Sequence, residues 1–123
     1  MIKNPDLMIL ILKDIQNNYS MGGYFSDKII IDKFSKEEIS YNLQLLHDEN
    51  FVLYKDTTVH GLSCKRFLIE RLTIQGEEFL ELSKNSGAWK KAKDVLIPTG
   101  TFILEMARDI MVAHISSLLS IGK

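Results

Sequence analysis

The chain has 123 residues, of which 46% are apolar and 25% are charged, and its formal net charge is −1. This length and apolar content suit one globular domain with a short appended element, and they exclude a chain that is disordered over most of its length. The near-neutral charge excludes a histone-like coat protein, so any contact with DNA must come from a local basic patch.

Cysteine usage and the apolar runs indicate the compartment. Cys64 is the single cysteine, which excludes an intrachain disulfide and a thiolate metal cluster built from one chain. The apolar run near the N-terminus is too short for a signal peptide, and the one near the C-terminus is interrupted by charged residues. We therefore expect a cytoplasmic protein with no membrane-spanning segment.

The first third of the chain predicts a helix and then a strand. Asn4 can cap a helix over residues 5–18, and Pro5 suits its first position because proline lacks the amide hydrogen that would be unpaired there. The β-branched run Ile29 to Ile31 favours a strand within residues 27–34. Gly22 and Gly23 allow no more than a turn between these two elements.

A second helix is predicted from Ser35 to about Glu49. Ser35 and Glu38 have the spacing of a capping box, and an apolar stripe follows at helical intervals. Asn50 tolerates the left-handed conformation that ends a helix. The stripe consists of Ile39, Leu43 and Leu46.

The rest of the chain predicts a hairpin and three helices. Strands at 51–58 and 65–73 flank a loop in which Gly61 can take a positive φ. Helices follow from Thr73 to about Lys84, around Trp89, and over about 101–120. A helix that leads directly into a hairpin is typical of a winged helix. We thus predict an α+β, mostly helical fold with a winged helix-turn-helix domain at 1–84 and a helical extension at 85–123.

Three segments of the chain resemble known sequences. Residues 39–52 (ISYNLQLLHDENFV) resemble the recognition helix and following strand of winged-helix repressors. Together with residues 72–80 (LTIQGEEFL) and 88–93 (AWKKAK), they resemble an uncharacterised domain-of-unknown-function family of bacteria and prophages, the one numbered 2513. The resemblance implies a winged-helix fold, a cytoplasmic setting and a phage or mobile-element origin, and it supplies no established activity.

Winged-helix geometry predicts a set of DNA-binding residues. The helix before the hairpin enters the major groove and the hairpin acts as the wing. On this basis the side chains nearest the bases are Ser40, Tyr41 and Gln44, and those that hold phosphates are Lys36, Lys55, Lys65 and Arg66. The first hypothesis is therefore a small phage-type regulator that binds double-stranded DNA.

The charge of the same helix supports a different function. Residues 36–49 contain one lysine against Glu37, Glu38, Asp48 and Glu49, and carboxylates that face phosphates oppose binding. The alternative is a protein-interaction module on a winged-helix scaffold, which binds and modulates a host or phage protein without binding DNA. A purely structural dimer is a third reading.

The last predicted helix is apolar around most of its circumference. Such a helix must be covered on most sides, either by its own domain or by a second subunit. A twofold homodimer is favoured over an internal helix of a monomer, and the lack of basic residues on the polar face disfavours a membrane-surface helix. The residues assigned to dimerisation are Ile103, Ala107, Ile110, Met111, Ile115 and Leu118.

Catalysis has little support in the sequence. His47, His60 and His114 lack the spacing of a zinc site, and the sequence contains no phosphate loop, dinucleotide fingerprint or nucleophile elbow. Cys64 precedes two basic residues, a setting compatible with redox sensing, although a lone hairpin cysteine is more often inert. We expect a protein that is not an enzyme and that uses neither a metal nor a cofactor.

Overall fold

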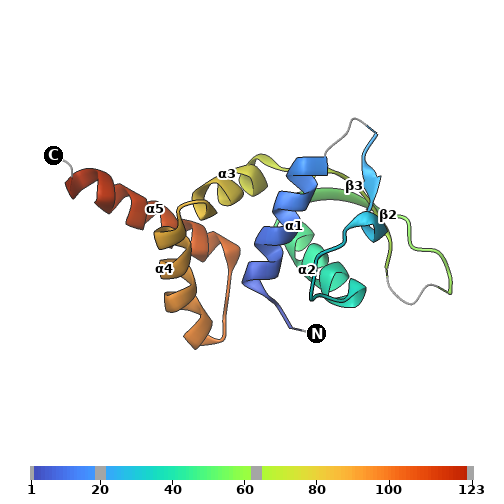
Figure 1. Ribbon diagram of the computed structural model, residues 1–123, viewed down its shortest axis with the longest axis horizontal. Coiled ribbons are helices and arrows are strands. Elements are labelled where there is room, and N and C mark those ends of the chain that lie inside the picture. Colours follow the sequence, from blue (N-terminus) through green and yellow to red (C-terminus); the bar gives the residue numbers. More distant parts are fainter. Residues whose placement is uncertain (1, 19–21, 62–64, 122–123) are drawn as a thin grey trace. The chain divides into compact units, whose positions relative to one another are not determined.

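The computed structural model describes residues 2–18, 22–61 and 65–121, and of residues 120 and 121 only the backbone (Figure 1). Cys64 and the tip of the predicted hairpin loop lie outside the described residues. The structure is α+β and mostly helical, as predicted. Its elements in chain order are α1 (Pro5–Asn18), β1 (Tyr24–Phe25), η1 (Ser26–Lys28), α2 (Lys36–Asp48), β2 (Val52–Asp56), β3 (Phe67–Leu72), α3 (Ile74–Ser83), α4 (Ser86–Leu96), η2 (Ile97–Thr99) and α5 (Leu104–Ile121).

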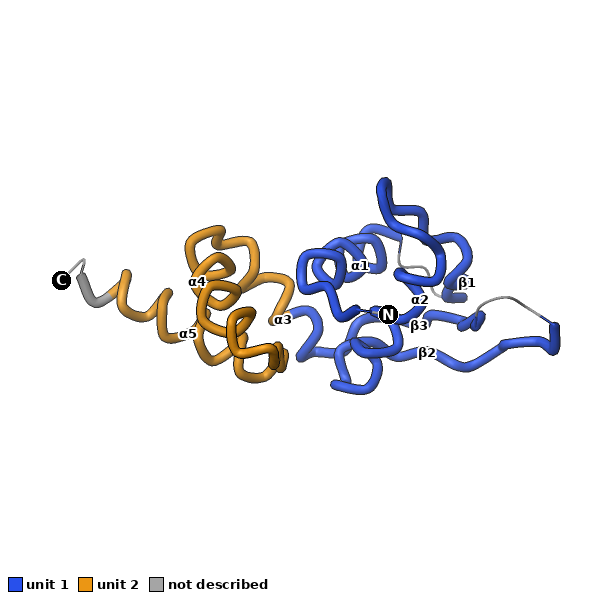
Figure 2. Tube along the Cα trace, turned by 90° about the horizontal axis from the view of Figure 1, so that it is seen from below, with its two compact units in different colours: residues 1–77 blue, residues 78–123 orange. Residues whose placement is uncertain are grey.

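The chain divides into two compact units, residues 1–77 and 78–123 (Figure 2). The division falls inside α3, earlier than the boundary after residue 84 that the sequence indicated. In unit 1, α1 packs against α2 and β3. The apolar stripe predicted for α2 is confirmed, because Ile39, Leu43 and Leu46 are all buried.

Local capping determines where the helices of unit 1 begin and end. The Asn4 side chain accepts a hydrogen bond from the amide of Leu7 at 3.1 Å, and this caps α1. Ser35 and Glu38 form both hydrogen bonds of the predicted capping box at the start of α2. Asn50 takes the expected left-handed conformation after α2, with φ 64°. These ends need no tertiary contact, which is why the sequence predicts them.

The sheet of unit 1 is three-stranded, antiparallel and ordered β1-β3-β2. Tyr24 pairs with Ile69 in the central strand, and β2 pairs with β3 along its whole length around a bulge at Leu53 and Tyr54. Gly23 has φ +72°, and a Cβ there would collide with the Ile69 carbonyl oxygen, so only glycine fits. The sequence of helix, short strand, turn, helix and hairpin is compatible with a winged-helix-like fold.

The strand predicted at 27–34 is wrong. β1 occupies Tyr24–Phe25, and Ser26 then ends the pairing because its hydroxyl, in place of the backbone, accepts the hydrogen bond from the Phe67 amide at 2.9 Å. The residues that follow form η1 and an extended segment outside the sheet. Ile29 is 1% exposed whereas Ile30 is 83% exposed, so this β-branched run anchors one side chain in the core rather than forming a strand.

Unit 2 contains the end of α3, the helix α4 and the helix α5, and α4 packs along α5. Trp89 lies edge-on to Phe79 and to Phe102, with ring centroids 5.8 Å apart in each pair. Gly100 turns the chain between η2 and α5 with φ 75°. Among the described residues, no helix has the length and apolarity that crossing a bilayer requires.

Candidate nucleic-acid interface

The outward face of α2 carries two carboxylates. Glu37, Tyr41, Gln44 and Asp48 recur at intervals of four, three and four residues, which places them on one side of the helix. Glu37 and Asp48 are exposed, and Tyr41 and Gln44 are partly exposed. An acidic group therefore lies near each end of the helix face that the winged-helix comparison would direct toward DNA.

Ser40 does not belong to this outward face, which corrects the prediction that it contacts a base. Its side chain is 8% exposed. The Gln44 amide nitrogen donates to the Ser40 carbonyl oxygen at 3.2 Å and lies 3.4 Å from the Ser40 hydroxyl. The reason is helical periodicity: Ser40 is next to Ile39 and three residues before Leu43, and so lies at the margin of the buried stripe.

Three stacked rings join α2 to the hairpin. The His47 ring lies on the Tyr54 ring with 3.9 Å between centroids, and Tyr54 lies on Phe67 with 4.1 Å between centroids. Burial raises the pKa of Tyr54 to about 12, and the nearby carboxylates of Asp48 and Asp56 contribute. Tyr54 is therefore neutral at physiological pH and serves as an apolar contact between β2 and its neighbours.

Each basic side chain predicted for the wing lies beside a carboxylate. Lys55 Nζ is 3.6 Å from Glu70 Oε1. Arg66 Nε is 3.7 Å from Asp27 Oδ2, and the guanidinium carbon lies 3.7 Å above the centre of the Phe25 ring. These four charges cancel in pairs, so the hairpin carries less positive potential than its sequence suggests.

Lys65 is exposed at the base of the hairpin loop and also has an acidic neighbour. Hydrogen bonds from Thr58 lower the pKa of Asp56, and the charge of Lys65 adds to this shift. The Thr58 amide donates to Asp56 Oδ1 at 2.8 Å. The Asp56 carboxylate is therefore ionised and reduces the positive potential around Lys65.

The sequence reading missed two lysines near the start of α2. Lys28 ends η1, and Lys33 lies in the turn before α2 with φ 73°. Both are exposed, as is Lys36 in the first turn of the helix. None of the three forms an ion pair within the described part of the chain. The sequence could have indicated them, because residues 28–36 contain three lysines around the predicted helix cap Ser35.

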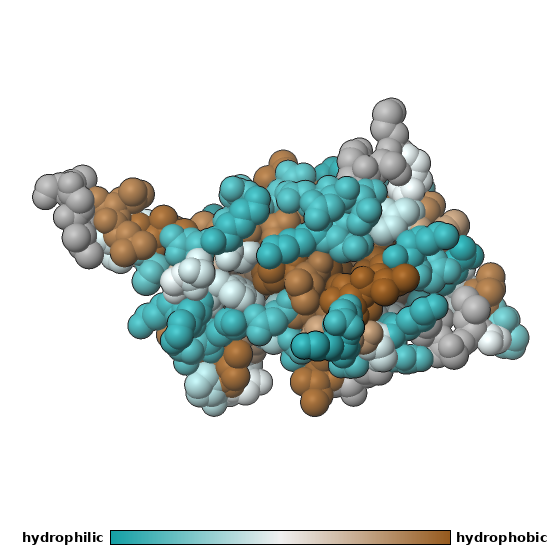
Figure 3. Space-filling model, in the orientation of Figure 1, coloured by the Kyte–Doolittle hydropathy of each residue, from teal (hydrophilic) through white to brown (hydrophobic). Residues whose placement is uncertain are grey.

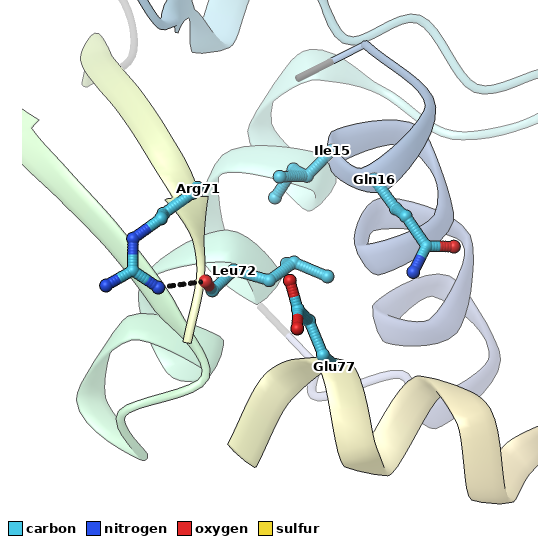
Figure 4. Close-up of a pocket in the computed structure, with 5 residues that line it drawn as sticks. All are labelled: Ile15, Gln16, Arg71, Leu72 and Glu77. Carbon is cyan, nitrogen blue, oxygen red and sulfur yellow. Dashed lines mark hydrogen bonds between the residues drawn. The ribbon is translucent and has the colours of Figure 1, made fainter. Parts of the chain in front are cut away.

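A small cavity in unit 1 has a volume of about 270 Å³ and is lined by residues of α1, β3 and α3, namely Ile15, Gln16, Arg71, Leu72 and Glu77 (Figure 4). Arg71 donates from Nη1 to the Leu72 carbonyl oxygen at 2.8 Å. Its guanidinium points away from Gln16 and Glu77, as Figure 4 shows. The polar groups do not converge on one point, so we assign no small-molecule ligand to this cavity.

The described residues contain no group of three or more histidine, cysteine, aspartate or glutamate side chains placed to hold a metal ion. His47 is stacked on Tyr54 and His60 is exposed near the hairpin loop. His114 lies on α5 beside Gly87 of α4. The three histidines thus occupy separate parts of the structure.

The residues predicted for dimerisation fall into two groups, and all but Ile103, which precedes α5, lie on that helix. Ala107 and Met111 are fully buried inside unit 2, which corrects their assignment to an interface. They face inward because α4 packs along α5 and covers that side. The remaining four are partly or largely exposed, namely Ile103, Ile110, Ile115 and Leu118.

Comparison with known proteins identifies the family. No curated protein and no solved structure matches the chain. A family model described as "Hypothetical protein (DUF2513)" matches residues 3–101. This range includes η1, α2, the β2–β3 hairpin and α4, and it ends before α5. The chain therefore belongs to the DUF2513 family.

Proposed function

We propose that this protein binds double-stranded DNA through α2 and the β2–β3 hairpin. The observation that carries the proposal is a group of three exposed lysines around the start of α2, a helix that leads directly into a hairpin. Lys28, Lys33 and Lys36 form no ion pair with the residues that the structure describes. In winged-helix proteins these are the elements that contact the DNA backbone and the major groove.

The side chains divide into two roles in this proposal. Lys28, Lys33 and Lys36 hold phosphates, and Tyr41 and Gln44 on the outward face of α2 reach the base edges. Lys55, Lys65 and Arg66 on the hairpin add phosphate contacts. The ion pairs of Lys55 and Arg66 are partly or largely exposed. Such pairs contribute about 1 kcal/mol or less, so phosphates can replace the carboxylates at low cost.

The role of a transcription regulator is part of the same proposal. It is supported by the likeness of residues 39–52 to winged-helix repressors, and the phage or mobile-element origin rests on the family resemblance. A cytoplasmic location follows from a DNA-binding role and agrees with the single cysteine of the chain.

Fluorescence anisotropy of a labelled duplex, titrated with the protein over a series of salt concentrations, tests the proposal. We expect saturable binding whose log affinity falls linearly with log salt. The double variant Lys33→Ala/Lys36→Ala should weaken binding and lower the salt slope by about 2, because each phosphate contact contributes roughly 0.9. The matched control Lys13→Ala/Lys91→Ala removes the same charge from exposed sites elsewhere and should bind as the wild type does.

Two outcomes would contradict DNA binding. The first is no saturable binding at low salt with protein at tens of micromolar, the range in which non-specific affinities commonly lie. The second is an equal loss of affinity in both double variants, since the lysines near α2 would then contribute only net charge.

The acidic outward face of α2 favours a second candidate, a protein-interaction module that binds a host or phage protein. Glu37 and Asp48 flank Tyr41 and Gln44 on this face, and such a face complements a basic protein surface. The variant Asp48→Lys separates the two candidates. It should strengthen DNA binding if α2 faces DNA, and it should abolish capture of a basic protein partner from nuclease-treated lysate if α2 faces a protein.

A further inference from the structure

A groove of about 450 Å³ lies on unit 2 between α3 and α5. Its apolar lining comes from Leu82 of α3 and from Val112 and Ile115 of α5. Its remaining lining residues are charged, and two of them face each other, because Arg108 Nε lies 3.9 Å from Glu78 Oε2. This combination of an apolar floor and charged flanks suits an amphipathic helix.

The second half of α5 extends past the helix that covers its first half. An 11-residue helix such as α4 rises about 16 Å and an 18-residue helix such as α5 about 27 Å. The N-terminal turn of α4 reaches His114, because a Cβ added at Gly87 would lie 3.3 Å from the His114 Nε2 atom. The turns of α5 beyond His114 therefore have no neighbour in α4.

This extending part of α5 is apolar. Leu118 is 48% exposed and Leu119 is 72% exposed, and residues 110–121 contain no Asp, Glu, Lys or Arg. Figure 3 shows hydrophobic side chains on the part of α5 that extends past α4. Two helical turns without packing are marginal in water, and exposed apolar surface of this kind marks a contact site.

The groove and the exposed leucines belong to one stripe of α5. Arg108, Val112, Ile115 and Leu119 recur at intervals of four, three and four residues and so share one face of the helix. The half of this stripe nearer Arg108 lines the groove, and the half nearer Leu119 is unpacked. The same face of α5 thus lines the groove at one end and, at the other, forms an apolar ridge around Leu119 that fits such a groove.

We infer that a second copy of this chain occupies the groove. The two α5 helices pack antiparallel around a twofold axis near Ile115, so that Leu119 of each copy lies against Val112 of the other. A twofold interface uses the same patch on both subunits. This stripe meets that requirement, because its ridge at Leu119 fits the groove at Val112 of a second copy. The inference does not depend on the proposed binding of DNA.

Charge disfavours a parallel arrangement, because a parallel pair would set the two Arg108 side chains against each other. In the antiparallel pair Arg108 instead meets the last turn of the other α5, whose carbonyl groups carry partial negative charge and which Lys123 follows in the sequence. Glu78 and Glu81 meet no like charge in the antiparallel pair, because residues 110–121 of the other copy contain no acidic side chain.

The mass of the 123-residue chain in solution tests this inference. Light scattering coupled to size-exclusion chromatography at tens of micromolar should give twice the 14.1 kDa mass of the chain. Val112→Glu in the groove and Leu119→Glu in the ridge should each give the monomer mass. Ser117→Glu is the matched control, since Ser117 lies on the opposite side of the extending turns and is exposed, and it should stay dimeric.

A charge-swapped variant tests the pairing of ridge and groove. Val112→Lys combined with Leu119→Glu in one chain places a lysine against a glutamate twice across the proposed interface, and association should return. In a Cys64→Ser background, a short bismaleimide should cross-link Ile115→Cys near the axis and leave Ser117→Cys unlinked. Circular dichroism and Trp89 fluorescence verify that each variant is folded.

Three results would overturn the inference. One is a monomer mass for the wild type throughout the micromolar range. Another is a dimer that persists in both glutamate variants, since a different surface would then hold it. The third is a dimer that the charge-swapped variant fails to restore although it is folded, because Leu119 and Val112 would then not meet.

Discussion

His47 of α2 stacks face to face on Tyr54 of β2, with 3.9 Å between ring centroids and 6° between ring planes. Tyr54 in turn stacks on Phe67 of β3. The stack therefore runs from the helix through both strands of the hairpin. It fixes the hairpin beside α2 through side chains, so the position of the proposed wing does not depend on the conformation of its loop.

Removal of the outer ring should weaken this connection. We expect His47→Ala to lower the free energy of unfolding by about 1 kcal/mol, the amount that a well-stacked aromatic pair contributes. Urea denaturation followed by circular dichroism measures it. His60→Ala is the control: this histidine is exposed next to the hairpin loop, and its loss should change stability by less than about 0.5 kcal/mol. Equal effects of the two substitutions would show that the stack contributes nothing.

Alkaline pH should destabilise the protein through its partly buried tyrosines Tyr24 and Tyr54. Burial raises the pKa of Tyr54 to about 12 from an ordinary value of 10.0, and burial and the neighbouring Asp14 raise the pKa of Tyr24. A raised pKa in the folded state means that the folded protein holds these protons more tightly than the unfolded chain does. The resulting stability is complete below pH 10 and is lost as the pH rises toward 12.

Urea unfolding at several pH values tests this dependence. The free energy of unfolding of the wild type should fall between pH 10 and pH 12, and the fall should be smaller in Tyr54→Phe, which has no phenol to ionise. In a titration followed by ultraviolet absorbance, some of the four tyrosines should ionise at a higher pH than the others. An identical slope for Tyr54→Phe and the wild type would rule out Tyr54 as a source of the pH dependence.

Gly76 should tolerate no side chain. It lies in the first turns of α3, where a Cβ would collide with the carbonyl oxygen of Phe51. That oxygen also accepts a hydrogen bond from the Thr73 amide at 3.0 Å, so it is not able to move freely. We expect Gly76→Ala to cost on the order of 2 kcal/mol, as overpacking in a core does, although alanine is the better helix former.

Gly22→Ala is the matched control for this substitution, because nothing lies within 4 Å of an added Cβ at that position. Its effect on thermal or urea unfolding should stay within about 0.5 kcal/mol. If Gly76→Ala proved as stable as Gly22→Ala, the close approach of α3 to Phe51 would be wrong.

Asn42 should be important for holding the N-terminal residues. It is buried on α2, and its Oδ1 accepts from the Asn4 amide at 2.8 Å. Its Nδ2 donates to the carbonyl oxygens of Glu38 at 2.9 Å and of Ile2 at 3.3 Å. Asn42→Ala leaves the partly buried Asn4 amide without this acceptor, and we expect a loss of about 1–3 kcal/mol.

Hydrogen exchange provides a local readout for the same variant. The Asn4 amide should exchange faster in Asn42→Ala than in the wild type, whereas the exposed control Asn17→Ala should leave it protected. Unchanged protection of Asn4 would contradict the assigned hydrogen bond.

The division of roles in the DNA proposal predicts two different phenotypes. Gln44→Ala should alter sequence preference, because Gln44 is assigned to base edges, while Lys65→Ala/Arg66→Ala should weaken binding to every sequence and lower the salt slope by about 2. Competition titrations with several duplexes measure both effects. A uniform loss of affinity from both variants would remove Gln44 from base recognition.

The sequence by itself determined the α+β class, the presence of the helices and the ends of α1 and α2, whereas α5 begins at Leu104, three residues later than predicted. The caps at Asn4 and Ser35, the left-handed stop at Asn50 and the buried stripe of α2 depend on residues within one or two turns, and local spacing reveals them. The resemblance carried by residues 39–52, 72–80 and 88–93 was specific enough to give the family, which the family model confirms.

The tertiary structure decided which side chains are exposed and so available for contact with a partner. Strand pairing is not local, so only the presence of β3 selects Tyr24–Phe25 as its partner and leaves Ile30 in solvent. Arg66 lies beside Asp27 through a contact between elements distant in sequence. On α5 an apolar pattern cannot by itself distinguish a core position from an interface position. The packing of α4 places Ala107 and Met111 inside and leaves Leu118 and Leu119 exposed, because a helix of 11 residues covers only part of a helix of 18.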